Sequence, residues 1–328
     1  MFAAAIESIL IQQCTPAVVR AIEAGASPQP LAAALEDAGF YELLTPEDVG
    51  GGGANWREFF EVVLLCGTHA VPLPLAQTLA ARSLVTQPQA LPPGLLTIAP
   101  LAYRSEDGCI EAPHVPFART ASHVLAVQGD TLAVFGTADA SELATGIHGS
   151  LAATLRWGEG AGRPIAPAIS ADRFFALAAL LHAALLAGAM KRAFDLTMAY
   201  ANERMQFGKP IGKFQAIQHQ LSVMAEHVAA GRMAAEAAFA VGEGLPTLAA
   251  CAAAKARTSE AAQLVSSIAH AVHGAIGITE EYDLQLFTRR LHEWRMAHGS
   301  EAYWHRRLGQ LFVESPEPLA TDFVRSIF

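Results

Sequence analysis

The sequence predicts a mainly helical α+β protein. We expect an N-terminal helical domain over residues 1–88, a small middle β-domain over 89–168 and a C-terminal antiparallel helix bundle over 169–328. Apolar residues recur at helical spacing in the first and last parts. Proline, glycine and β-branched residues increase only in the middle part, where short apolar runs are typical of strands. Hydrophobic residues make up 52% of the chain and charged residues 16%, which supplies a large core.

The N-terminal part predicts short helices on either side of Thr15-Pro16, a pair typical of a helix start. Residues 25–30 break the pattern, and Trp56–Cys66 indicates an amphipathic helix. The glycines at 50–53 lack the Lys-Ser/Thr and the preceding strand of a phosphate-binding loop. We therefore expect an ordinary loop there.

The middle part alternates short β-branched runs with turn residues. Gln128-Gly129-Asp130 indicates a hairpin turn between two of these runs. The expected strands are Leu95–Ala99, Cys109–Glu111, His123–Val127, Thr131–Phe135 and Leu151–Trp157.

The last part predicts long helices that pack as an antiparallel bundle. The apolar run Phe174–Met190 contains His182 and falls just short of a membrane-spanning length, so we expect a bundle core helix without a membrane span. Gly188 would allow another helix to approach closely. The expected helices run from Asp172 to about Phe207, then Gln215–Gly242, Thr247–Val272, Glu280–His298 and Glu301–Phe312.

Composition excludes several classes of function. The net charge is −9 without a basic block, so we expect no nucleic-acid partner. The N-terminus lacks the basic region and cleavage site of a signal peptide. The cysteines are scattered without metal or disulfide spacing, which suits a reducing cytoplasm and predicts no metal site. They are Cys14, Cys66, Cys109 and Cys251.

The stretch Tyr200–Gln220 carries the most informative pattern. Arg204 and Phe207 are three residues apart, so on a helix they would share a face near its C-terminal end. An arginine can fork onto a phosphate, and a phenylalanine can cover an aromatic ring. Taken alone, the pair also fits an exposed arginine beside a core aromatic residue.

The longer pattern R-x-x-F-G-K-P-I-G-x-F-Q-x-x-Q-H resembles the flavin-binding signature of the acyl-CoA dehydrogenases. The segment Pro72-Leu73-Pro74-Leu75 also resembles this family. The resemblance implies FAD as cofactor, an acyl-CoA substrate, an electron-transferring flavoprotein as acceptor, and a homo- or hetero-oligomer, either dimer or tetramer. It further implies that Arg204, Phe207 and Gln215 contact the flavin nucleotide across a subunit boundary.

A second family motif, Q-x-x-G-G-x-G-x-T, here reads A-V-H-G-A-I-G-I-T over residues 271–279. Gly274 and Gly277 persist, so the resemblance assigns them to the cofactor site. The glutamine has become Ala271, which removes one hydrogen bond worth roughly 0.5–1.5 kcal/mol.

The family's catalytic base is a glutamate at one of two positions, and neither is a carboxylate here. One position lies in the element before the last helix and is occupied by His298; the other lies on the first bundle helix and is occupied by Ala178. The resemblance also implies that Ser300, in the same element as His298, contacts the cofactor. His298 is then the candidate catalytic base, since imidazole titrates near neutrality. Alternatively, the chain is a partner subunit without turnover of its own, or His298 is a solvated or capping side chain.

The middle part departs further from the family. Its T-E-P-x-x-G-S-D stretch and its W-x-T motif are missing, and the domain is short. In this the chain resembles members that pair as unequal subunits in bacterial degradation of branched or steroid side chains.

Overall fold

The computed structural model describes residues 2–85, 90–128, 131–165, 169–240 and 244–328. The chain divides into two compact units, residues 1–63 with 71–181 and residues 64–70 with 182–328. The boundaries that we predicted at 88 and 168 fall on residues outside the described ranges, so the three-domain division stays a prediction.

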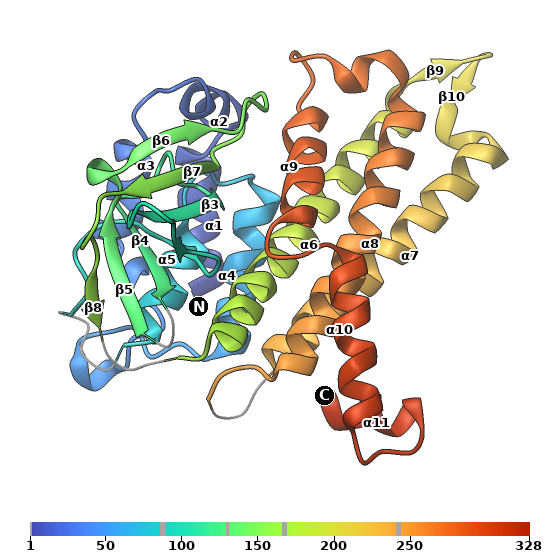
Figure 1. The fold of residues 1–328 in the computed structure, drawn as a ribbon. Coiled ribbons are helices and arrows are strands. Elements are labelled where there is room, and N and C mark those ends of the chain that lie inside the picture. The colour runs from blue at the N-terminus through green and yellow to red at the C-terminus, as the bar shows by residue number, and fades with distance from the viewer. Residues whose placement is uncertain (1, 86–89, 129–130, 166–168, 241–243) are drawn as a thin grey trace. The chain divides into compact units, whose positions relative to one another are not determined.

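Short helices make up the N-terminal part, as predicted (Figure 1). Thr15 begins the second helix: its Oγ1 accepts a hydrogen bond from the Val18 amide at 3.4 Å, and Pro16 fills the first helical position. The residues from Gly50 onward form a loop after a 3₁₀ turn, also as predicted. The helices are α1 (Phe2–Gln13), α2 (Pro16–Glu23), α3 (Gln29–Asp37), α4 (Trp56–Thr68) and α5 (Leu75–Ser83), with 3₁₀ turns at Phe40–Glu42 and Glu47–Val49.

Two four-stranded sheets follow in the described part of the first unit. One has the order β1-β4-β5-β8 with β1 parallel to β4, and the other is antiparallel with the order β2-β3-β7-β6. Their apolar side chains form one core, in which the rings of Phe135 and Trp157 lie 4.7 Å apart. The strands are β1 (Leu96–Ala99), β2 (Tyr103–Arg104), β3 (Ile110–Val115), β4 (His123–Gln128), β5 (Thr131–Gly136), β6 (Ser141–Ala144), β7 (Ala153–Trp157) and β8 (Arg163–Ile165).

All the predicted strands are present, whereas β2, β6 and β8 were not predicted. These three are short and mostly exposed, so they lack the apolar run that indicates a strand. The predicted hairpin turn includes residues 129–130, which lie outside the described ranges.

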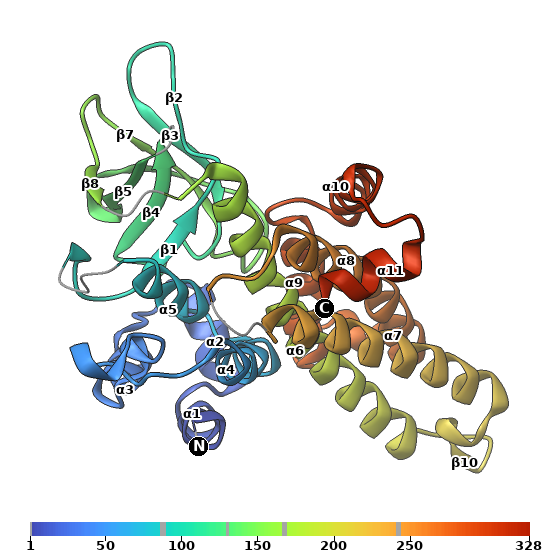
Figure 2. The same cartoon turned by 90° about the horizontal axis from the view of Figure 1, so that it is seen from below.

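Long helices make up the C-terminal part, which confirms the predicted fold class. The helix α8 packs against α7, α9 and α10, and α7 and α8 lie side by side (Figures 1 and 2). A Cβ on Gly188 would lie 2.0 Å from the Leu64 carbonyl oxygen, so this glycine does allow a close helix approach. The helices are α6 (Ala171–Glu203), α7 (Gln215–Phe239), α8 (Leu248–His273), α9 (Leu284–Met296), α10 (Glu301–Glu314) and α11 (Ala320–Ile327).

Among the described residues, two helices are long and apolar enough to cross a membrane by length and composition alone, and the bent pair α1–α2 would pass only if it were taken as one span. In α6, 89% of the apolar window is buried within the protein. In the helical stretch Leu248–Ile278 the share is 44%, and this stretch packs along three neighbouring helices. Burial in the protein therefore accounts for the apolar run of α6.

The first bundle helix ends earlier than predicted. It stops at Glu203, and β9 (Met205–Gln206) pairs with β10 (Lys209–Pro210) in a two-stranded hairpin. Phe207 and Gly208 form the turn with φ values of 50° and 78°, as a tight hairpin turn requires. Arg204 and Phe207 thus do not share a helix face, which corrects the sequence prediction.

Candidate functional site

The β9–β10 hairpin presents the predicted nucleotide-binding residues to solvent. Arg204 is exposed and Phe207 is 91% exposed. The Lys209 Nζ lies 4.3 Å from the centroid of the Phe214 ring, which Phe207 approaches edge-on at 6.1 Å. Gln215 follows as the exposed first residue of α7. The hairpin therefore combines cations, an amide and aromatic rings on one exposed surface.

The glycine turn after α8 lies at the same end of the bundle. The Tyr200 ring on α6 stacks on His273 at 4.5 Å, and His273 immediately precedes Gly274. Gly274 begins a 3₁₀ turn, Gly274–Ile278, with a φ of 64°. Gly277 is buried, and a Cβ there would lie 3.0 Å from the His273 Cβ. The turn predicted from the two glycines is present.

The chemistry of these five residues suits an extended nucleotide. A Cβ on Gly274 would meet nothing within 4 Å, so its backbone is open to a ligand. Phe207 combines a positive φ with an exposed ring, and a positive φ is uncommon for a bulky residue. An arginine side chain can pair with a phosphate and a phenylalanine ring can cover an aromatic ring, so the hairpin side chains suit a dinucleotide.

The turn between α9 and α10 holds the remaining predicted residues and is buried. His298 is 9% exposed and has a φ of 55°, so it is not a solvated side chain. Its ring lies edge-on to the His182 ring of α6, with 4.9 Å between centroids. The Trp304 Nε1 donates a hydrogen bond to the His298 carbonyl oxygen at 2.8 Å. Ser300 is the residue before α10 and is half-buried.

A buried lysine stands beside this turn. The Lys255 Nζ of α8 donates hydrogen bonds to the carbonyl oxygens of Trp294 at 2.6 Å and Arg295 at 3.0 Å, and to the Ser259 hydroxyl at 3.1 Å. Burial lowers the pKa of Lys255 to about 7; Glu301 raises it and Arg295 lowers it. All three N–H donors of the ammonium thus bond to protein acceptors.

The surroundings of His298 favour its neutral form. Burial lowers the pKa of His298 well below its ordinary value of 6.5, and the nearby His182 and Lys255 lower it further. The carboxylate next to the turn, Glu301, forms an ion pair with Arg295, with 2.8 Å between Nε and Oε2. This hydrogen bond lowers the pKa of Glu301. Both groups are therefore poor proton acceptors near neutral pH.

The predicted site residues fall into two sets, one at each end of α9. This helix has 13 residues, which correspond to about 20 Å. His182 and Lys255 were not predicted as site residues. The sequence feature that could have indicated His182 is its position four residues, or one helical turn, after Ala178 on α6. The signal for Lys255 is a lone charge in an alanine-rich helix.

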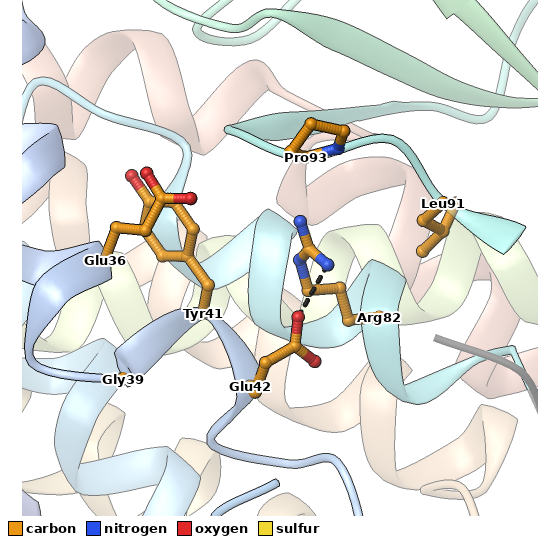
Figure 3. A pocket seen from close by; sticks show the side chains of 7 residues that line it. All are labelled: Glu36, Gly39, Tyr41, Glu42, Arg82, Leu91 and Pro93. Atoms are coloured by element: carbon orange, nitrogen blue, oxygen red, sulfur yellow. Dashed lines mark hydrogen bonds and ion pairs between the residues drawn. The ribbon is translucent and has the colours of Figure 1, made fainter. Parts of the chain in front are cut away.

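A separate cavity of about 360 Å³ lies in the first unit (Figure 3). The Arg82 Nη1 lies 2.6 Å from the Glu42 Oε1, and its Nη2 donates to the Pro92 carbonyl oxygen at 3.2 Å. Burial raises the pKa of Tyr41 above its ordinary value. Arg82 already has a carboxylate partner, so this ion pair ties α5 to a 3₁₀ turn. The lining residues are Glu36, Gly39, Tyr41, Glu42, Arg82, Leu91 and Pro93.

Comparison with known proteins identifies the family. Residues 169–310 match the family model described as acyl-CoA dehydrogenase, C-terminal domain. The chain is 32% identical over 302 residues to acyl-CoA dehydrogenase IpdE2 of Mycolicibacterium smegmatis, covering 88% of this chain and 90% of that protein. IpdE2 of Mycobacterium tuberculosis is also 32% identical, with 95% and 96% covered.

Solved structures agree. A variant of the Tcur3481–Tcur3483 steroid ACAD is similar with a TM-score of 0.83 and 26% identity, covering 95% of this chain and 96% of that chain. The ChsE4–ChsE5 complex of Mycobacterium tuberculosis has a TM-score of 0.82 and 21% identity, with 96% and 97% covered. A glutaryl-CoA dehydrogenase of Mycobacterium smegmatis in complex with FADH2 has a TM-score of 0.72 and 16% identity, with 97% and 95% covered.

The fold and the relatives together define a flavoprotein oxidoreductase. The chain belongs to the acyl-CoA dehydrogenase family. It is a flavin-dependent acyl-CoA dehydrogenase or a subunit of one, with FAD as cofactor.

Proposed function

We propose that this chain works as the subunit without the catalytic carboxylate in a heteromeric acyl-CoA dehydrogenase. The observation that carries the proposal is the buried, neutral His298 at the position of the family's glutamate. Removing an α-proton from a CoA thioester requires a base whose pKa lies near the working pH. A histidine held neutral beside His182 and Lys255 meets this requirement poorly.

The exposed end of the bundle supports a role in cofactor binding. Arg204, Phe207 and Gln215 would contact the pyrophosphate and adenine side of FAD in a neighbouring subunit, together with Gly274 and Gly277. When bound, FAD accepts the β-hydride of the acyl chain. Ser300 would lie near the flavin from the α9–α10 turn.

The relatives suggest the partner and the substrate. One similar structure is described as the Tcur3481–Tcur3483 steroid ACAD, and another as the ChsE4–ChsE5 complex. We propose a CoA thioester of a steroid degradation intermediate as substrate, an unequal dehydrogenase subunit as partner, and an electron-transferring flavoprotein as acceptor. We place the reaction in the cytoplasm.

Co-expression with the product of the neighbouring gene, as the candidate partner, tests this function. We expect the chain alone to bind little flavin, and the complex to be yellow and to bleach when an acyl-CoA is added without oxygen. In the complex, His298→Ala should keep bleaching within about threefold of wild type, as should the exposed control His305→Ala. Loss of bleaching in His298→Ala, with flavin retained, would make His298 the base and refute the proposal.

A second candidate function is an enzyme that is active alone through His298. Its support is the positive φ of His298, because strained backbone gathers at functional sites. The single chain would then bind flavin and bleach with acyl-CoA, and His298→Glu would leave or raise that activity.

A further inference from the structure

Lys255 is fully buried in the middle of α8, where a charged side chain is expensive. Taking an ammonium out of water is unfavourable unless hydrogen bonds replace the lost water. Two of its three acceptors are the carbonyl oxygens of Trp294 and Arg295. These carbonyls belong to the last turn of α9, where helix carbonyls have no partner within the helix and a cation is favourable.

The turn that follows these carbonyls is strained and tightly enclosed. His298 adopts a left-handed backbone, with a φ of 55°, which is unfavourable for a non-glycine residue. Gly299 also has a positive φ, and a Cβ there would lie 2.8 Å from the Trp304 Nε1. Trp304 fixes the far side of the turn through its hydrogen bond to the His298 carbonyl. Lys255 fixes the near side through the end of α9.

We propose that Lys255 is the positioning residue of the α9–α10 turn: its ammonium anchors the end of α9 and thereby holds the His298 ring against His182. The backbone carbonyls cannot move without breaking these bonds, so the direction of the turn is set from α8. Only the expected effect on flavin reduction rests on the proposed function. That effect assumes that Ser300, which belongs to the same turn, faces the flavin.

An ion pair with a nearby carboxylate does not explain why Lys255 is buried. The carboxylate that raises its pKa, Glu301, has its oxygens hydrogen-bonded to Arg295. Two other titratable groups near the turn are His182 and His298, whose imidazole rings supply no negative charge to an ammonium. The lysine is therefore held by helix carbonyls, as a helix C-cap is.

The Trp304 indole reports directly on this turn. The chain has 4 tryptophans, so ¹⁵N-tryptophan labelling gives a simple NMR spectrum, and Trp304→Phe assigns the signal. We expect Lys255→Met to move the Trp304 signal, whereas the matched exposed control Lys191→Met should not. In the flavin-loaded complex, Lys255→Met should slow flavin reduction at saturating acyl-CoA by about tenfold, with the half-saturating concentration unchanged.

Three outcomes overturn the proposal. One is an unmoved Trp304 signal in Lys255→Met. Another is a variant with a lower melting temperature but a wild-type rate of flavin reduction. If the variant does not fold, the wild type decides: the Trp304 signal should show a step near pH 7 as Lys255 loses its proton, and a flat profile from about pH 6 to 9 overturns the proposal. If no complex binds flavin, the proposed function fails, but the NMR test still stands.

Discussion

Replacing Lys255 by methionine should change how the stability of the protein depends on pH above neutrality. Burial lowers the pKa of Lys255 from 10.5 to about 7, so the folded protein releases this proton earlier than the unfolded chain does. Between these two pH values unfolding takes up a proton. The free energy of unfolding therefore rises with pH in this window, and the full penalty for the buried charge is present below it.

The size of the effect follows from the proton uptake. One proton changes the free energy of unfolding by up to about 1.4 kcal/mol per pH unit. From about pH 7.5 to 9.5 the wild type should thus gain about 2–3 kcal/mol relative to Lys255→Met. Methionine has a similar length and no charge, and apolar replacement of a buried charge is often tolerated.

Urea unfolding at several pH values, followed by tryptophan fluorescence, measures this difference. The slope with urea should be the same for both proteins, so that midpoints report stability alone. Contributions of the other titrating groups cancel in the comparison. If the stability difference between wild type and Lys255→Met stays constant from about pH 7.5 to 9.5, the lowered pKa of the buried Lys255 is refuted.

Four further predictions concern other parts of the chain. Gly188→Val should lower the free energy of unfolding, measured in urea, by more than about 3 kcal/mol, because the new side chain would clash with the Leu64 carbonyl. The control Gly309→Ala has open space around it and should be neutral or stabilising. Thr247→Ala should cost about 1 kcal/mol in thermal unfolding, because the Thr247 Oγ1 caps α8. Phe207→Ala should leave the melting temperature unchanged but weaken flavin retention on gel filtration of the complex. Because the pKa of His298 is lowered by burial, unfolding takes up a proton below about pH 6.5, so the wild type should lose stability with acid and His298→Ala should lose less.

Periodicity and composition sufficed for the fold class, because the long helices and main strands each bury a regular apolar face. The end of α6 could not be predicted in the same way. Residues 204–206 contain no helix breaker, and phenylalanine rarely adopts the positive φ of Phe207. Pairing of Met205–Gln206 with Lys209–Pro210 decides the outcome, and that pairing depends on packing rather than on local propensity.

The candidate site was predictable where motif residues lie close in sequence and not where helices meet. Arg204 and Gly274 were found from their motifs, although only the stacking of Tyr200 on His273 places them at one end of the bundle. Lys255 could not be assigned to the site from its own helix, because its partners come from α9. A lone charge among alanines indicates burial, but the sequence does not say which acceptors it meets.

The two ends of α9 differ in a way that bears on the proposed division of labour. At one end, His298 is enclosed, neutral and backed by a lysine, so proton uptake there is opposed by burial and by charge. At the other end, Arg204 and Phe207 are exposed to solvent. A subunit that supplied both base and cofactor contacts to itself would need the reverse: an accessible base and enclosed cofactor residues. Under our proposal, the chain supplies its partner with flavin contacts and receives the carboxylate in return.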